Sequence, residues 1–179
     1  MQALMRCVAR FGIEGATLSR VAEEAGLSRP LIRHHLGNRD NLIAQLQGFV
    51  LTRLNEGIDA LVSALDGMKD AKSVVHILFA AEGHSTPSMT LAFAALTADA
   101  RKDDALKEGC RKIILRMEDE VAKFLEPHMP SRSVAQDCAH GIIAIYFNVT
   151  AFEALDMPQS CAKRARDLSL HLIDTTGKP

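Results

Sequence analysis

The sequence has 179 residues, of which 47% are apolar and only 4% aromatic, with no tryptophan and a formal net charge of −1. This length suits one large or two small domains with a real hydrophobic core. The four cysteines, at positions 7, 110, 138 and 161, lie too far apart for a C-x-x-C metal motif. Each is expected to be a small buried apolar residue, and no metal or cofactor is expected.

Apolar residues recur at helical spacing through nearly the whole chain, and no segment alternates like a strand between hairpin turns. We therefore predict an all-α fold. The predicted helices, in chain order, cover residues 1–12, 18–25, 29–36, 39–65, 71–82, 87–100, 103–126, 132–155 and 159–174. Gly48 and Gly57 interrupt the longest helix, so a bend or a close helix contact is expected near either.

Residues 17–42 have the pattern of two short helices joined by a tight turn and followed by a third helix. Thr17 is a good N-cap for the first helix, and Gly26 ends it where a left-handed residue is needed. Ser28 caps the second helix, and Pro30 lies in its first turn, where a missing N–H costs nothing. These signals predict a helix-turn-helix.

The spacing of the second helix decides which of its side chains can reach a ligand. If Leu27, Ile32 and Leu36 face inward, the other side chains of residues 29–36 must point outward from a helix narrow enough for a DNA major groove. Arginine offers a fork of donors to guanine or phosphate, Leu31 an apolar contact to a thymine methyl, and Ser28 and Thr17 short donors to phosphates. The outward-pointing candidates are Arg29, Leu31, Arg33 and His34.

At these residues the chain resembles the TetR family of transcriptional repressors. The matching positions are Thr17, Val21-Ala22, Ala25-Gly26-Leu27-Ser28, Ile32-Arg33-His34-His35-Leu36 and Arg39. The resemblance covers about 45 residues, and it adds His35 and Arg39 to the expected DNA contacts. Arg33 stands where the family has a phosphate-contacting tyrosine, so this contact is expected to be ionic here. The resemblance also implies a homodimer.

Charge is distributed unevenly along the chain. Residues 1–48 carry six Lys or Arg against four Asp or Glu, whereas residues 49–179 carry 15 against 18. The basic excess therefore lies in the motif, although its size is modest. The longest apolar runs are too short to cross a bilayer and no targeting sequence is visible, so we expect no membrane partner and a location in the bacterial cytoplasm.

The last two predicted helices have the pattern of a surface that meets its own copy. Their apolar residues step three or four positions along one side, which suits a four-helix bundle between two subunits. The predicted dimer interface consists of Ile142, Ile145, Val149, Phe152, Ala165, Leu168 and Leu172.

The C-terminal helices are expected to enclose a pocket for a small, largely apolar effector, with polar groups from Tyr146 and Asn148. The residues expected to line it are Phe79, Phe93, Ile114, Met117, Tyr146 and Asn148. All of these residue types also occur in ordinary cores. The acidic clusters at 103–104 and 118–120 look like solvated helix starts or faces, so no catalytic residues are expected.

The sequence thus predicts a homodimeric DNA-binding regulator, a repressor released from a near-palindromic operator by a small effector. Residues 1–48 would form the helix-turn-helix DNA-binding domain, and residues 49–179 the helical effector-binding and dimerisation domain. The alternative is a helical dimerisation or adaptor protein that does not bind DNA. Salt-dependent DNA binding would separate the two. The operator, the effector and the genes controlled are not readable from these residues.

Overall fold

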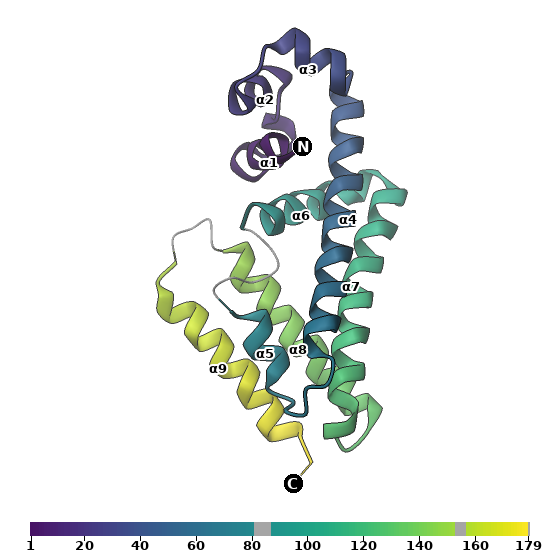
Figure 1. Cartoon of the computed structure of the whole chain (residues 1–179), viewed down its shortest axis with the longest axis vertical. Helices are drawn as coiled ribbons and strands as arrows, with labels where there is room; N and C mark the ends of the chain where they lie inside the picture. Colours follow the sequence, from purple (N-terminus) through teal and green to yellow (C-terminus); the bar gives the residue numbers. More distant parts are fainter. Residues whose placement is uncertain (81–86, 153–156, 179) are drawn as a thin grey trace. The chain divides into compact units, whose positions relative to one another are not determined.

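A computed structural model describes residues 1–80, 87–152 and 157–178, and within these ranges the chain is helical with no strand. The all-α prediction is confirmed. The α-helices are α1 (Gln2–Gly15), α2 (Leu18–Ala25), α3 (Arg29–Leu36), α4 (Arg39–Leu65), α5 (Ser73–Leu78), α6 (Pro87–Asp99), α7 (Asp104–Leu125), α8 (Arg132–Ala151) and α9 (Gln159–Thr176) (Figure 1). Two short 3-10 turns, Ala100–Lys102 and Glu126–His128, follow α6 and α7.

Most predicted helix bounds agree with the structure to within a few residues, and the differences are local. The α1 helix extends beyond residue 12, but Gly12 inside it has φ 68° and ψ 175°, so regular helix stops there. The α5 helix begins at Ser73 and ends at Leu78, shorter than predicted. Residues 81–82 and 153–155, predicted to be helical, lie outside the described residues.

The chain divides into two compact units. The first unit consists of residues 1–54 and 86–111, and the second of residues 55–85 and 112–179. Helices α4 and α7 each contribute residues to both. This division differs from the predicted boundary after residue 48, because α6 and the start of α7 group with the motif helices. The boundary of the DNA-binding domain itself stays a prediction.

In the first unit, α1 packs against α6 and α2, and α2 packs against α3. The core contains fully buried Leu4, Val8, Leu42 and Leu46 from α1 and α4. The α4 helix runs without interruption through Gly48, and a Cβ built there would have no neighbour within 4 Å. The close helix contact predicted near Gly48 is therefore not found.

In the second unit, α8 packs along α9 and α5 packs against α9 (Figure 1). An ion pair of 2.6 Å between Lys72 and Asp174 joins the start of α5 to α9. Arg116 of α7 donates hydrogen bonds to Asn55 and Asp59 of α4, the first at 2.6 Å. These contacts hold the second unit together on polar as well as apolar side chains.

Three of the four cysteines are buried as expected, and the expectation was wrong for Cys161. Cys7, Cys110 and Cys138 are buried, and Cys161 is partly exposed. Burial raises the pKa of the Cys7, Cys110 and Cys138 thiols, because an apolar interior disfavours the thiolate. The three buried thiols are thus poor nucleophiles in the folded chain.

Candidate nucleic-acid interface

The turn between α2 and α3 is built by local hydrogen bonds. The Thr17 hydroxyl oxygen accepts from the Arg20 amide at 3.3 Å, and the Ser28 hydroxyl oxygen accepts from the Leu31 amide at 3.4 Å. Gly26 has φ 64° and ψ 29°, a left-handed conformation that ends α2. The following amide, of Leu27, donates to the Ala22 carbonyl at 2.9 Å. This is a Schellman-type helix end, which lets α3 start two residues later.

The α3 helix has one buried and one exposed face. Ile32 is only 5% exposed and holds the helix on the unit. Leu36 is partly buried. Leu27, which was expected to face inward, is 48% exposed, so this expectation was wrong. Its backbone closes the turn after Gly26, and this geometry turns its side chain toward solvent.

The residues predicted to contact DNA are exposed, with one exception. Exposed side chains are those of Thr17, Ser28, Arg29, Leu31, Arg33, His34 and His35. The two histidine rings lie edge to face with centroids 5.1 Å apart. Five of these residues come from α3, so the helix exposes four possible donors together with Leu31.

Arg39 is the exception, because its guanidinium is engaged within the chain. Its Nη2 donates to the Ile13 carbonyl oxygen at 2.8 Å and lies 3.3 Å from a Glu14 carboxylate oxygen. These bonds tie the start of α4 to the end of α1. A phosphate would have to compete with Glu14 for this guanidinium.

Pairing with carboxylates separates the arginines of residues 1–48 into two groups. Arg6 and Arg10 share Glu24, at 2.7 and 3.5 Å, and Arg39 has Glu14. In the parts of the chain that the structure describes, Arg20, Arg29 and Arg33 have no carboxylate partner. Positive charge that is not neutralised internally therefore lies on α3 and at the start of α2. Sequence reasoning missed Arg20, although its position three residues after the Thr17 cap was visible.

The residues predicted to bind an effector are distributed over both units. Phe79 and Tyr146 are brought together in the second unit, with ring centroids 5.8 Å apart at 84°. Met117 is buried and Ile114 partly buried, but Asn148 is exposed. Phe93 is buried in α6 of the first unit. Tyr146 is thus buried in contact with Phe79, whereas Asn148 is exposed.

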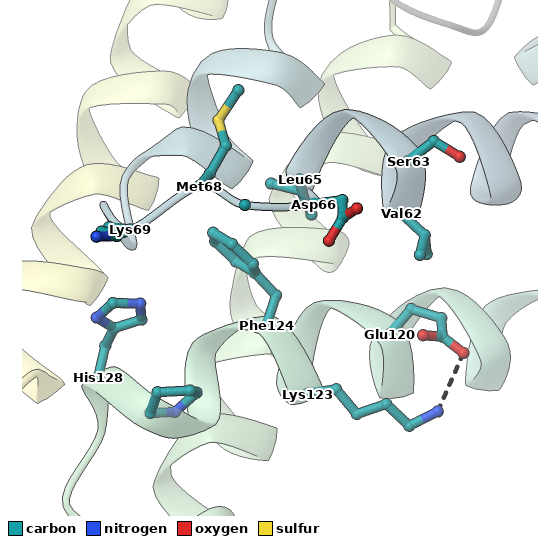
Figure 2. Close-up of a pocket in the computed structure, with 12 residues that line it drawn as sticks. Val62, Ser63, Leu65, Asp66, Met68, Lys69, Glu120, Lys123, Phe124 and His128 are labelled. Atoms are coloured by element: carbon teal, nitrogen blue, oxygen red, sulfur yellow. Dashed lines mark hydrogen bonds and ion pairs between the residues drawn. The ribbon is translucent and has the colours of Figure 1, made fainter.

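An open groove of about 690 Å³ lies between the C-terminal ends of α4 and α7, and none of the predicted effector residues lines it. Figure 2 shows Phe124 between the two helix ends, with Lys69 and His128 together on one side of it. Lys123 is held by Glu120 at 3.0 Å. The groove therefore combines apolar side chains with side chains of both charges.

The predicted dimer residues differ in how far the chain itself covers them. Ile142 and Ala165 are buried within the chain, while Ile145, Val149 and Leu172 are partly exposed. Phe152 is 45% and Leu168 51% exposed. The α8–α9 pair therefore uses part of the predicted apolar stripe for its own packing and leaves its outer part open to solvent.

A capped two-helix motif whose second helix exposes arginines, histidines and one leucine above a buried isoleucine defines a helix-turn-helix DNA-binding domain. Residues 1–46 match the family described as "Bacterial regulatory proteins, tetR family". This N-terminal segment is therefore a TetR-family helix-turn-helix, as its motif indicated.

Relatives and solved structures agree with this assignment. The chain is 37% identical over 70 residues to the HTH-type transcriptional repressor AcnR of Corynebacterium glutamicum, covering 38% of this chain and 37% of that protein. Against the HTH-type transcriptional regulator BetI of Brucella suis it is 23% identical over 182 residues, covering 100% of this chain and 91% of BetI. The chain spans about a third of the length of AcnR and of the Pseudomonas fluorescens BetI, at 37% and 33%.

The fold as a whole is also that of the family. A TetR-family regulator from Cytophaga hutchinsonii aligns with a TM-score of 0.72 and 14% identity, covering 99% of this chain and 94% of that one. A TetR-family regulator from Rhodococcus sp. aligns with a TM-score of 0.66 and 20% identity, covering 99% and 95%. Within the described ranges, no helix combines the length and hydropathy that a membrane span requires.

Proposed function

We propose that the protein is a homodimeric repressor that inserts α3 of each subunit into successive major grooves of a near-palindromic operator. The observation that carries this proposal is the exposed face of α3, where Arg29 and Arg33 have no carboxylate partner among the described residues and Ile32 is buried. Two such helices must lie about 34–36 Å apart to reach one face of the duplex. The relative AcnR is a transcriptional repressor, which supports the sign of regulation proposed here.

The homodimer is proposed from the outer side of the α8–α9 pair. Leu168 and Phe152 are about half exposed there. Each would expose less apolar surface to water in a dimer than in a monomer. Sedimentation equilibrium at micromolar concentration tests the assembly. A monomer at that concentration would contradict a mechanism in which two α3 helices bind one operator. Leu168→Asp should dissociate a dimer without unfolding α9.

An effector is proposed to bind in the second unit near Phe79 and Tyr146. It would be small and largely apolar, because the two aromatic rings are in contact and Tyr146 is only 8% exposed. The α4 helix begins at Arg39 beside the motif and continues to Leu65 in the second unit, so its tilt is the natural link between the two sites. The effector can release DNA only by the difference in its affinity for the bound and released states.

The experiment is fluorescence anisotropy of the purified protein with labelled DNA from upstream of its own gene, across a salt series. Binding should exceed that to random duplex, strengthen at low salt and weaken in Arg33→Ala. Lys163→Ala removes an exposed cation of α9 and is the control, which should bind like the wild type. Failure to bind either duplex at low salt would refute the proposal and favour a helical adaptor instead.

A further inference from the structure

An exposed aromatic ring that two guanidiniums contact lies outside the surface of α3. The Phe11 side chain at the end of α1 is 42% exposed. Arg20 Cζ lies 4.6 Å and Arg10 Cζ 5.0 Å from the centroid of its ring. Arg20 Nη1 also donates to the Gly15 carbonyl oxygen at 2.9 Å. Stacking and this hydrogen bond both hold the Arg20 side chain in one orientation.

The two arginines differ in their electrostatic surroundings. Arg10 lies 3.5 Å from a Glu24 carboxylate oxygen, and that carboxylate also binds Arg6. Arg20 has only the neutral Gly15 carbonyl as an acceptor among the described residues. A guanidinium has five N–H donors, so most of the Arg20 donors remain available for an anion. Its charge is therefore available for a ligand, whereas the charge of Arg10 is offset.

The position of Arg20 determines which anion it can meet. Side chains on a helix lean toward its N-terminus, and the bond to Gly15 shows the guanidinium beside the turn that precedes α2. Thr17, a predicted phosphate contact, is in the same turn and accepts from the Arg20 amide. In helix-turn-helix complexes the first motif helix crosses the DNA backbone while the second enters the groove.

We infer that Arg20 is a phosphate-contacting residue of the DNA interface, and that Phe11 is the positioning residue that orders its guanidinium. The inference rests on the proposed DNA-binding function. A side chain already held in one orientation loses less conformational entropy on binding than a free arginine, which favours the contact. The contact carries no base preference, since phosphates are the same at every sequence.

The test compares Arg20→Gln with Arg10→Gln, two variants that remove a guanidinium from the same ring. Both are titrated with the upstream duplex and with a random-sequence duplex in a sodium chloride series. In Arg20→Gln the slope of log affinity against log salt should fall by about 0.9 per lost phosphate contact, or about 1.8 for a dimer that loses one contact in each subunit. Arg10→Gln should keep the wild-type slope, because Glu24 already offsets that charge.

Two further variants separate a phosphate contact from a structural role. Arg20→Lys keeps the charge and should keep most of the slope, although it loses the guanidinium fork. Phe11→Leu should lower affinity for both duplexes with the slope unchanged, since it disorders the arginine without removing it. Thermal unfolding of each variant, without DNA, tests whether the first unit is folded.

The outcomes distinguish the inference from the proposed function. If the wild-type protein binds DNA but Arg20→Gln and Arg10→Gln have the same slope of log affinity against log salt, the inference is wrong. The proposed function would then still stand. A loss restricted to the upstream duplex would also overturn it, because a phosphate contact acts on both. A wild-type protein that binds neither duplex at low salt would overturn both.

Discussion

Replacing Gly26 and Gly48 by alanine, one at a time, should change stability in opposite directions. Neither alanine Cβ would meet an atom within 4 Å, so packing contributes to neither variant. Gly26 has φ 64°, where an L-residue costs about 1–2 kcal/mol, offset by about 0.4–1 kcal/mol of reduced freedom in the unfolded chain. Gly48 lies inside α4, where alanine is favoured by about 0.5–1 kcal/mol.

The assay is urea unfolding followed by circular dichroism, at one protein concentration for all variants. With m-values of about 1–3 kcal/mol per molar urea, a change of about 1 kcal/mol moves the midpoint by roughly 0.3–1 M. Gly26→Ala should lower the midpoint and Gly48→Ala should raise it. A raised midpoint in Gly26→Ala would refute the left-handed helix end between α2 and α3.

Further predictions concern α3, the thiols and their pH dependence. Ile32→Ala should destabilise the first unit by about 2–5 kcal/mol, whereas Leu31→Ala, at an exposed site, should stay within about 0.5 kcal/mol and weaken only DNA binding; urea unfolding and anisotropy check the pair. Ser28→Ala should cost about 1 kcal/mol through the lost cap, and Ser28→Asn should restore most of it; a midpoint unchanged by alanine would argue against the cap. Ellman's reagent should modify Cys161 first, with Cys7, Cys110 and Cys138 reacting only as the chain opens; equal rates for all four would contradict their burial. Because burial raises the pKa of the Cys138 thiol, its contribution to stability is complete below the ordinary thiol pKa and is lost as pH rises through the higher folded value, so alkaline urea midpoints should fall less in Cys138→Ala.

The local features of the motif could be predicted from the sequence because they depend on neighbours in the chain. Thr17, Gly26 and Ser28 each act through residues at most five positions away. Helix periodicity identified the fold class for the same reason, since each helix repeats its own apolar spacing. Leu27 was predicted wrongly because periodicity was extended across a turn, where the helical phase does not hold.

The electrostatic pattern of the interface could not be predicted, because it depends on contacts between distant residues. Glu24 neutralises Arg10 from 14 positions away, and Glu14 holds Arg39 from 25 positions away. A count of arginines does not show which of them have such partners. The same limit applies to Asn148, which was predicted to line the effector pocket with Tyr146. Asn148 is exposed and Tyr146 is buried, because the two side chains leave α8 in different directions.

The aromatic contact between Tyr146 and Phe79 has a spectroscopic consequence. The chain has no tryptophan and one tyrosine, so all of its intrinsic tyrosine emission comes from a side chain that is 8% exposed in the second unit. Circular dichroism, in contrast, sees helices of both units. Denaturation curves from the two signals will coincide if the two units unfold in one cooperative transition. The curves will separate if the first unit unfolds independently. The fluorescence of Tyr146 in the wild-type chain thus reports on the unfolding of the second unit alone.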